Sequence, residues 1–467
     1  MSAGVPTGQG SPLDMTRDAD PDAVAPRAPL TQRVRAGLRT PRARRAIVDT
    51  LLLGGAWLIV VWILMTRSAG LPVWRTLWAE DGSQFLSKAF LDDGPGGWLE
   101  SYQGYLHLLP RMIAAGVVHA PVDQLPFWMA LISSLVAAGC FVLLAVGLRP
   151  WLPETWMQAG LVVALGCVRE ASGEVAANVA NLHWFVGLGL VGLVLLRPRT
   201  WWGSGVAAAT ALVFALTDAF VVFFLGAAGV LLVVRIVRRS PDVWRTTPVV
   251  AAMAVGALAQ VATSVRHPRT PPAADQLPWD TVRQLYVEQV WGDAVTFASM
   301  TGLELAFQAV VVVLLVAIAV VVGWRSRRED RLGGRLAVAA VFALASVFFL
   351  VLSVRVNHAY GDRYSFLPAA FMVTAVVVAV AGRTRVHRVL VGSVVLAMAA
   401  SAVQAGSVNY VQRTRGPDVV AGIDDARRAC EAGRKKVAVV VSPGALRDGE
   451  WTGNFRVVLP CSQVLGD

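Results

Sequence analysis

The sequence predicts an all-α polytopic membrane protein with about eleven transmembrane helices and a small α/β tail outside the membrane. Of its 467 residues, 55% are hydrophobic and only 16% are charged, and the mean hydropathy is +0.57. Long apolar stretches recur along the chain, and short loops rich in arginine separate them. Such a chain covers its apolar surface with lipid and with neighbouring helices, because it has no water-soluble core to build.

The formal net charge of +11 comes almost wholly from arginine, because Lys88, Lys435 and Lys436 are the only lysines. These arginines lie in short loops between apolar stretches, where positive charge fixes the side of the membrane that a loop occupies. We therefore expect no nucleic-acid partner. Residues 1–46 are polar, rich in Pro at first and then basic, which predicts a disordered cytoplasmic arm without a cleavable signal peptide.

A transmembrane domain is predicted over residues 47–406. If the apolar stretch Tyr105–Ala120 crossed the membrane, every later arginine-rich loop would lie outside. If it lies on the outer surface, these loops lie inside, the N-terminus is inside and the C-terminus is outside. The expected spans are Ile47–Met65, Leu125–Leu148, Met157–Cys167, His183–Leu196, Gly203–Leu216, Phe220–Val237, Pro248–Val265, Leu303–Gly323, Leu336–Val354, Tyr364–Ala381 and Val389–Ala405.

The first outer loop, residues 66–124, contains the stretch Trp78–Gly82, in which Glu80 and Asp81 are adjacent. Carboxylates beside a bilayer are costly to keep, so they are candidates for function. The alternative is that both cap a helix that runs on through Phe85, since acids suit a helix N-terminus.

Other unusual polar residues gather on the predicted outer side, which favours a site that opens outward. An alternative is that Arg363 and Tyr364 anchor a span at the interface, and that Asn178, Asn181 and His183 bond neighbouring helices. The candidates for substrate contacts are Tyr105, His107, Arg111, Asn178, Asn181, His183, Trp184, Arg355, Arg363 and Tyr364, and Arg169, Glu174 and Asp218 lie on the same predicted side.

Carboxylates opposite arginines suit the transfer of a group from a lipid-linked phosphate. A carboxylate can take a proton from the acceptor hydroxyl while arginine neutralises the departing phosphate. The GLGLVG stretch at 187–192 lies inside a span and is interpreted as a packing surface, not as a phosphate-binding loop. No HExxH or paired CxxC motif argues for a metal site, although a divalent metal remains possible as a cofactor.

Four short stretches resemble the GT-C superfamily of polytopic membrane glycosyltransferases, in its bacterial branch with an acidic first outer loop. They are WAEDGSQFL at 78–86, GYLHLLPR at 104–111, NVANLHW at 178–184 and GDRYSFLP at 361–368. The resemblance covers about residues 47–381 and implies a polyprenyl-phosphate-linked sugar as donor, used on the outer face of the cytoplasmic membrane. The donor sugar, and the acceptor in the cell envelope, cannot be identified from these stretches.

The resemblance also implies a general base in the first loop, either Asp81 or Glu80. Asp81 is preferred, because its shorter side chain beside Gly82 can be held more rigidly. Arg363, Arg111 and Arg355 are expected to hold the donor phosphate. Two other function classes stay open, namely a transporter or flippase of lipid-linked envelope intermediates and an inactive scaffold.

The tail over residues 407–467 differs from the rest in its composition. It predicts a short charged helix at Ile423–Gly433 and strands at Lys436–Val441 and Phe455–Leu459. Because the tail is expected in an oxidising compartment, Cys430 and Cys461 are predicted to form a disulfide, with two free thiols as the alternative.

Overall fold

The computed structural model describes residues 40–67, 70–91, 95–169, 171, 174–269, 276–292, 302–325, 332–357, 362–404, 416–447 and 450–466. The chain divides into two compact units, Met1–Val48 and Asp49–Asp467. Most of the predicted arm at 1–46 lies outside the described residues, and the cavity described below is formed by residues of the second unit.

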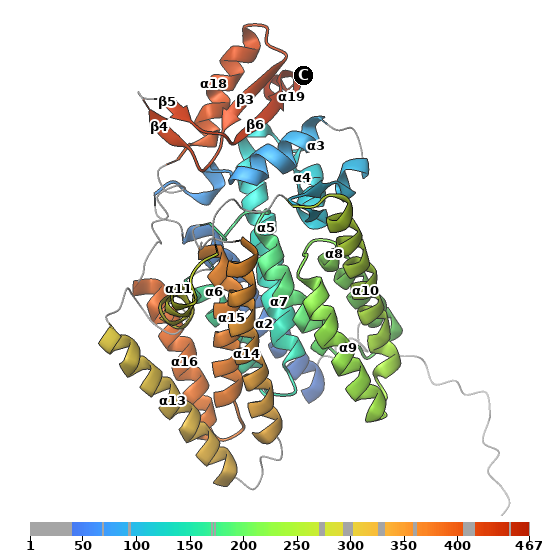
Figure 1. Cartoon of the computed structure of the whole chain (residues 1–467), viewed down its shortest axis with the longest axis vertical. Helices are drawn as coiled ribbons and strands as arrows, with labels where there is room; N and C mark the ends of the chain where they lie inside the picture. Colours follow the sequence, from blue (N-terminus) through green and yellow to red (C-terminus); the bar gives the residue numbers. More distant parts are fainter. Residues whose placement is uncertain are drawn as a thin grey trace, which may run out of the picture. The chain divides into compact units, whose positions relative to one another are not determined.

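Each of the eleven predicted spans coincides with a helix (Figure 1). The main helices are α2 (Pro41–Thr66), α5 (Leu125–Gly147), α6 (Thr155–Cys167), α7 (Leu182–Leu195), α8 (Trp201–Ala215), α9 (Val221–Val237), α10 (Val243–Arg266), α13 (Gly302–Arg325), α14 (Leu332–Asn357), α15 (Asp362–Val380) and α16 (Arg385–Gln404). The first loop adds η1 (Val73–Arg75), η2 (Asp81–Leu86), α3 (Ser87–Leu91), η3 (Pro95–Leu99), α4 (Leu108–Val117) and η4 (Val122–Gln124), and α10 is followed by α11 (Trp279–Leu285) and η5 (Tyr286–Gly292).

Five helices of the described chain are long and apolar enough to cross a membrane, namely α2, α5, α10, α14 and α15. Within α15, 94% of the most apolar window is buried, whereas only 28% of that window is buried in α10. The outer helices therefore expose large apolar side chains such as Leu258, Leu344 and Leu396. Apolar surface of this extent is typical of a protein that lies in lipid.

The stretch predicted as a surface helix over Tyr105–Ala120 is helical only in α4, which has ten residues. Such a helix is about 15 Å long, half of the hydrocarbon thickness, so it is too short to cross. It also starts later than expected, because β2 (Tyr105–Leu106) pairs with β1 (Ser101–Tyr102) in a short antiparallel hairpin. The turn between the two strands places Gly104 at a φ of +84°, which favours glycine.

Glycines bring the central helices together, as predicted for GLGLVG. A Cβ atom on Gly192 in α7 would lie 2.5 Å from the carbonyl oxygen of Leu143 in α5. A Cβ on Gly189 would lie 2.6 Å from the ring of Phe214 in α8. Small residues at such contacts let helix backbones approach closely, which confirms that the stretch is a packing surface.

Two buried arginines satisfy the carbonyl groups that helix C-termini leave unpaired. Arg67, just after α2, donates to the carbonyl oxygens of Cys167 at 3.1 Å and Val168 at 2.6 Å, at the end of α6. Arg235 in α9 donates to the carbonyl oxygen of Val194 at 3.2 Å, near the end of α7. These arginines thus fix neighbouring helix ends in addition to carrying charge.

The tail has the elements that the sequence predicts. The helix is α18 (Val419–Glu431), and β3 (Lys436–Val440) pairs antiparallel with β6 (Arg456–Pro460). Cys430 and Cys461 form the predicted disulfide, with their Cα atoms 5.4 Å apart. A second hairpin and a last helix were not predicted, and they are β4 (Ala445–Arg447), β5 (Glu450–Thr452) and α19 (Cys461–Leu465).

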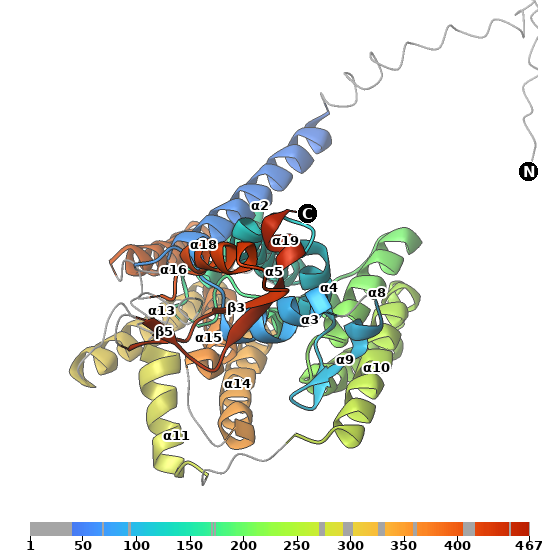
Figure 2. The ribbon, with the colours of Figure 1, turned by 90° about the horizontal axis from the view of Figure 1, so that it is seen from above.

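This tail packs directly against the first loop (Figures 1 and 2). The backbone N–H of Ser442 donates to the carbonyl oxygen of Leu77 at 2.9 Å, and that of Val458 donates to Ser87 Oγ at 2.9 Å. The tail and the first loop therefore lie at the same end of the helix bundle, which agrees with the even number of passes predicted between them. Which side of a membrane this end faces stays a prediction.

Candidate functional site

A cavity of about 380 Å³ lies at this end of the bundle, among the ends of several helices. Its walls come from the first loop, the start of α7, the turn between α8 and α9, the end of α10 and the segment after it, and the adjoining ends of α14 and α15. The lining residues include Glu80, Phe85, Tyr102, Tyr105, His107, Asn181, His183, Trp184, Asp218, Phe220, Arg269, Asn357, Arg363 and Tyr364.

The two adjacent carboxylates of the first loop have different environments. Glu80 is half-buried and lines the cavity. Asp81 is only 1% exposed, and its carboxylate accepts hydrogen bonds from the backbone N–H groups of Val179 at 3.2 Å and Ala180 at 2.9 Å. Glu80 therefore lies at the cavity wall, whereas backbone amides engage both oxygens of Asp81; which of the two acts as a base stays a prediction.

The alternative prediction was that both acids cap the helix that follows them, and neither side chain does so in the structure. Glu80 precedes η2, yet its side chain makes no capping hydrogen bond. Asp81 lies in the first turn of η2, and its carboxylate bonds the segment before α7. Asp81 thus connects the first loop to a segment almost a hundred residues further along the chain.

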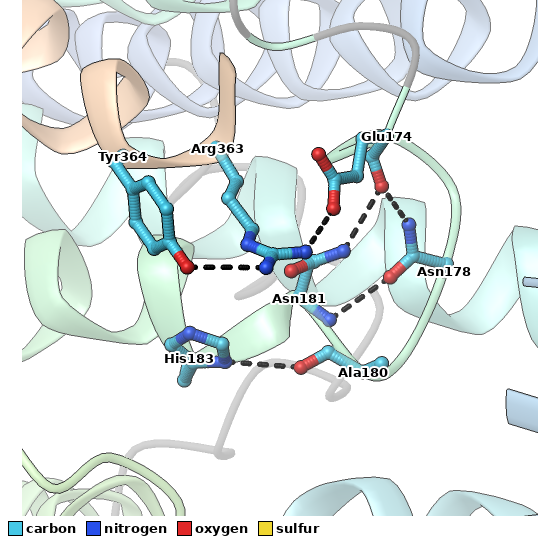
Figure 3. Close-up of polar contacts among 7 residues, drawn as sticks. All are labelled: Glu174, Asn178, Ala180, Asn181, His183, Arg363 and Tyr364. Atoms are coloured by element: carbon cyan, nitrogen blue, oxygen red, sulfur yellow. Dashed lines mark hydrogen bonds and ion pairs between the residues drawn. The ribbon is translucent and has the colours of Figure 1, made fainter. Parts of the chain in front are cut away.

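Arg363, at the start of α15, lines the cavity and forms an ion pair with Glu174, which is 6% exposed (Figure 3). A second nitrogen of its guanidinium donates to the Tyr364 hydroxyl at 3.1 Å. Asn181 Nδ2 donates to the backbone carbonyl oxygen of Glu174 at 3.0 Å, and Asn178 Nδ2 donates to the same oxygen. Asn178 does not line the cavity, and its contacts hold the segment that carries Glu174.

Two of the arginines predicted to hold phosphate lie elsewhere. Arg111 is 5% exposed and pairs with Glu100 at 3.3 Å, and Arg355 stacks 3.8 Å from the ring centre of Trp279. Neither lines the cavity. Local partners thus engage both side chains outside the cavity, and their predicted contact with a donor phosphate is not among the contacts of the cavity wall.

Arg269, which the sequence analysis did not select, lines the cavity instead. It is exposed, and it donates to Asn357 Oδ1 at 2.9 Å. Among the described residues it has no ion pair with a carboxylate. The position of Arg269 in the sequence could have indicated a functional role. It is an arginine on the predicted outer side, whereas arginines are enriched in cytoplasmic loops.

Aromatic rings form a continuous part of the cavity wall. Ring centres lie 4.0 Å apart for Tyr105 and His107, 4.6 Å for His183 and Trp184, and 5.9 Å for Trp184 and Tyr364. His183 Nδ1 lies 3.0 Å from the carbonyl oxygen of Ala180, so this nitrogen carries the proton and donates. Rings of this kind offer flat apolar faces with polar edges to a ligand.

Burial shifts the titration of several groups in the cavity. It lowers the pKa of His107 well below its usual value, and the neighbouring His183 and Arg111 lower it further, so His107 is neutral near pH 7. Burial raises the pKa of Asp218 to about 7, against one opposing hydrogen bond from the Phe220 backbone N–H. Burial also raises the pKa of Tyr105, and the charges of Asp218 and Glu80 add to that effect.

The site therefore combines one half-buried carboxylate, two guanidinium groups and aromatic walls. Within the described part of the chain, no group of three His, Cys, Asp or Glu residues could hold a metal ion. In such an arrangement a carboxylate like that of Glu80 can accept a proton, and guanidinium groups can bind an anion. The chain matches no family model, no curated protein and no solved structure in the comparisons made.

Proposed function

We propose that the protein is an integral membrane glycosyltransferase of the GT-C type, which moves a sugar from a polyprenyl-phosphate donor to an acceptor outside the cytoplasmic membrane. Eleven transmembrane passes, a cytoplasmic N-terminus and an outer C-terminus belong to this proposal. The observation that carries it is that Glu80, Arg269 and Arg363 line one cavity at the helix ends next to the first loop.

Glu80 serves as the general base. Its carboxylate accepts the proton of an acceptor hydroxyl while the oxygen of that hydroxyl forms a bond to the anomeric carbon of the donor sugar. The bond between this carbon and the phosphate oxygen breaks, and the electron pair leaves with the polyprenyl phosphate. Because a phosphate leaves as a stable anion, the reaction does not require a second carboxylic acid to protonate the leaving oxygen.

The guanidinium groups stabilise that anion. Arg269 is the principal phosphate contact, because no described carboxylate neutralises it and its planar group matches two phosphate oxygens. Arg363 already shares its charge with Glu174, so it orients the site and adds a weaker attraction. The aromatic wall at Trp184 and Tyr364 borders the space in which the sugar lies.

A transporter of lipid-linked intermediates is the rival proposal. Transporters place their ionisable residues near the middle of the bilayer, between internal repeats. Here the carboxylate and the two arginines lie at helix ends and in connecting segments, which favours chemistry at the membrane surface.

The test is transfer by the purified protein, supplied with a panel of polyprenyl-phosphate sugars and glycan acceptors. Replacing a general base usually lowers turnover by about 10²–10⁴-fold, so we expect this loss for Glu80→Gln with donor binding nearly unchanged. Glu431→Gln is the matched control, because Glu431 is exposed on the tail. Transfer at the wild-type rate by Glu80→Gln would reject Glu80 as the base.

A further inference from the structure

Two buried hydrogen-bond acceptors on the cavity wall have no partner among the described residues. They are Nδ1 of His107 and Oδ2 of Asp218, in side chains of residues that are 3% and 1% exposed. An unpaired polar group inside a protein is energetically costly, so most buried polar atoms are paired. Two such atoms on one wall point to partners that a ligand supplies.

The hydrogen-bonding role of His107 follows from its second ring nitrogen. Nε2 lies 3.2 Å from the backbone carbonyl oxygen of Tyr102, which can only accept, so Nε2 carries the proton. Nδ1 of the neutral ring then has a lone pair and no proton. A partner for this atom must therefore donate a hydrogen bond.

Asp218 presents a similar acceptor from the turn between α8 and α9. Its Oδ1 accepts a hydrogen bond from the backbone N–H of Phe220 at 2.9 Å, which fixes the carboxyl group in place. Oδ2 has no partner among the described residues, and it can only accept once the carboxyl group is ionised, above its pKa of about 7. It lies close to α7, since a Cβ atom on Gly187 would be 3.5 Å from it.

Tyr105 links these two groups on the wall. Its ring centre lies 4.0 Å from that of His107, and it lines the same cavity as Asp218. The wall thus brings one aromatic side chain together with two buried acceptor groups. A saturated ring that carries several hydroxyl groups has matching features, because its C–H face packs on an aromatic ring and its hydroxyl groups donate hydrogen bonds.

We propose that Tyr105, His107 and Asp218 form a subsite for a sugar ring, whose hydroxyl groups donate to His107 Nδ1 and Asp218 Oδ2. This inference rests on the proposed function only for the use of the cavity as a substrate site. The sugar belongs either to the donor or to the acceptor, and both offer the same hydroxyl chemistry.

The test measures binding at about pH 8.5, where the Asp218 carboxyl group is ionised, and it needs no turnover. The probes are farnesyl phosphate, a set of farnesyl-phosphoryl hexoses and pentoses, and the methyl glycosides of the same sugars. His107→Phe keeps a flat ring but removes the acceptor, and Asp218→Asn keeps Oδ1 while it turns Oδ2 into a donor. Exposed His119 and Asp123 supply the matched controls His119→Phe and Asp123→Asn.

Each of the two cavity variants should weaken binding of sugar-bearing probes about tenfold, as expected for one lost hydrogen bond. Farnesyl phosphate should bind as in the wild type, and neither control should change any affinity. A loss with the farnesyl-phosphoryl sugars assigns the subsite to the donor, and a loss with the methyl glycosides alone assigns it to the acceptor. His107→Asn should recover binding, because its amide oxygen again offers an acceptor near the position of Nδ1.

Three results would overturn the inference. The first is unchanged affinity of both variants for every sugar-bearing probe. The second is an equal loss for farnesyl phosphate, not recovered by His107→Asn, which indicates a structural role. The third is a wild-type protein that binds no sugar-bearing probe more tightly than farnesyl phosphate and binds no methyl glycoside. If the wild-type protein transfers no sugar from any donor of the panel but these variants still lose sugar affinity, the transferase proposal fails and the subsite stands.

Discussion

Replacing Asp81 should destabilise the protein, whereas replacing its neighbour Glu80 should affect catalysis. Asp81 is 1% exposed, and its two carboxylate oxygens accept hydrogen bonds from the backbone N–H groups of Val179 and Ala180. Hydrogen bonds to a charged group contribute about 1.5–3 kcal/mol each to stability. These two bonds join the first loop to the segment before α7.

Asp81→Asn keeps the shape of the side chain but gives it only one acceptor oxygen. One backbone N–H keeps its partner, while the other meets the new NH₂ group and stays unpaired. The lost bond and the unpaired group together should lower the free energy of unfolding by about 2–4 kcal/mol. Glu80→Gln should change this free energy little, because Glu80 is only half-buried and faces the cavity.

The measurement compares both variants with the wild type in detergent, by thermal unfolding followed through tryptophan fluorescence and by transfer activity per folded molecule. Asp81→Asn should melt at a lower temperature and retain activity where it is folded, whereas Glu80→Gln should melt like the wild type and lose activity. The opposite pattern, a stable Asp81→Asn protein without activity, would refute the assignment and return Asp81 to the role of base.

Three further predictions concern the tail and the cavity. Removing the disulfide with Cys430→Ser and Cys461→Ser should lower the stability of the tail by about 3–4 kcal/mol, because the bridge closes a sequence separation of 31 residues. We expect faster amide exchange in β3 and β6 and unchanged exchange in the long helices of the bundle. Gly82→Val should separate the tail from the first loop, because a Cβ atom at this position would lie 2.9 Å from Val441 Cγ1. We expect the free energy of unfolding of the tail to fall by about 1–3 kcal/mol and its proteolysis to become faster. Proteolysis at the wild-type rate would contradict this prediction. Burial raises the pKa of Asp218 from 3.8 to about 7, so between these pH values the folded state binds a proton that the unfolded state has released. The stability of the wild type therefore decreases over this range. Its melting temperature relative to that of Asp218→Asn should fall as the pH rises from about 4 to 7 and should then stay constant. A constant difference across this range would show that Asp218 does not titrate there.

Much of the helical architecture could be predicted from the sequence, because hydropathy and arginine position are local signals. The short helix α6 and the break at Thr217 both fall where expected. The start of α4 was missed, since pairing of Tyr105 and Leu106 with β1 takes precedence over their apolar character. The hairpin of β4 and β5 was missed because each strand has only three residues, too few for a periodic pattern.

The contact between the tail and the first loop joins segments that are far apart in the sequence. The strands of the tail were predicted from a local pattern, its disulfide followed from the expected outer compartment, and the predicted even number of passes placed it on the same side as the first loop. The structure joins the two through Ser442 with Leu77 and through an ion pair of Arg75 with Asp418 at 2.5 Å. The tail therefore supports the segment just before Glu80, which no motif in the sequence indicates.

The identity of the cavity-facing carboxylate could not be read from the motif, because Glu80 and Asp81 are adjacent and their roles depend on a distant segment. The backbone N–H groups of Val179 and Ala180, 98 and 99 residues further on than Asp81, distinguish the two side chains. By fixing Asp81 against the segment before α7, these bonds leave the longer side chain of Glu80 at the cavity wall. An acidic pair of this kind is thus best understood as one anchoring and one cavity-facing carboxylate, and the anchoring residue is the one whose loss should be visible in stability before it is visible in catalysis.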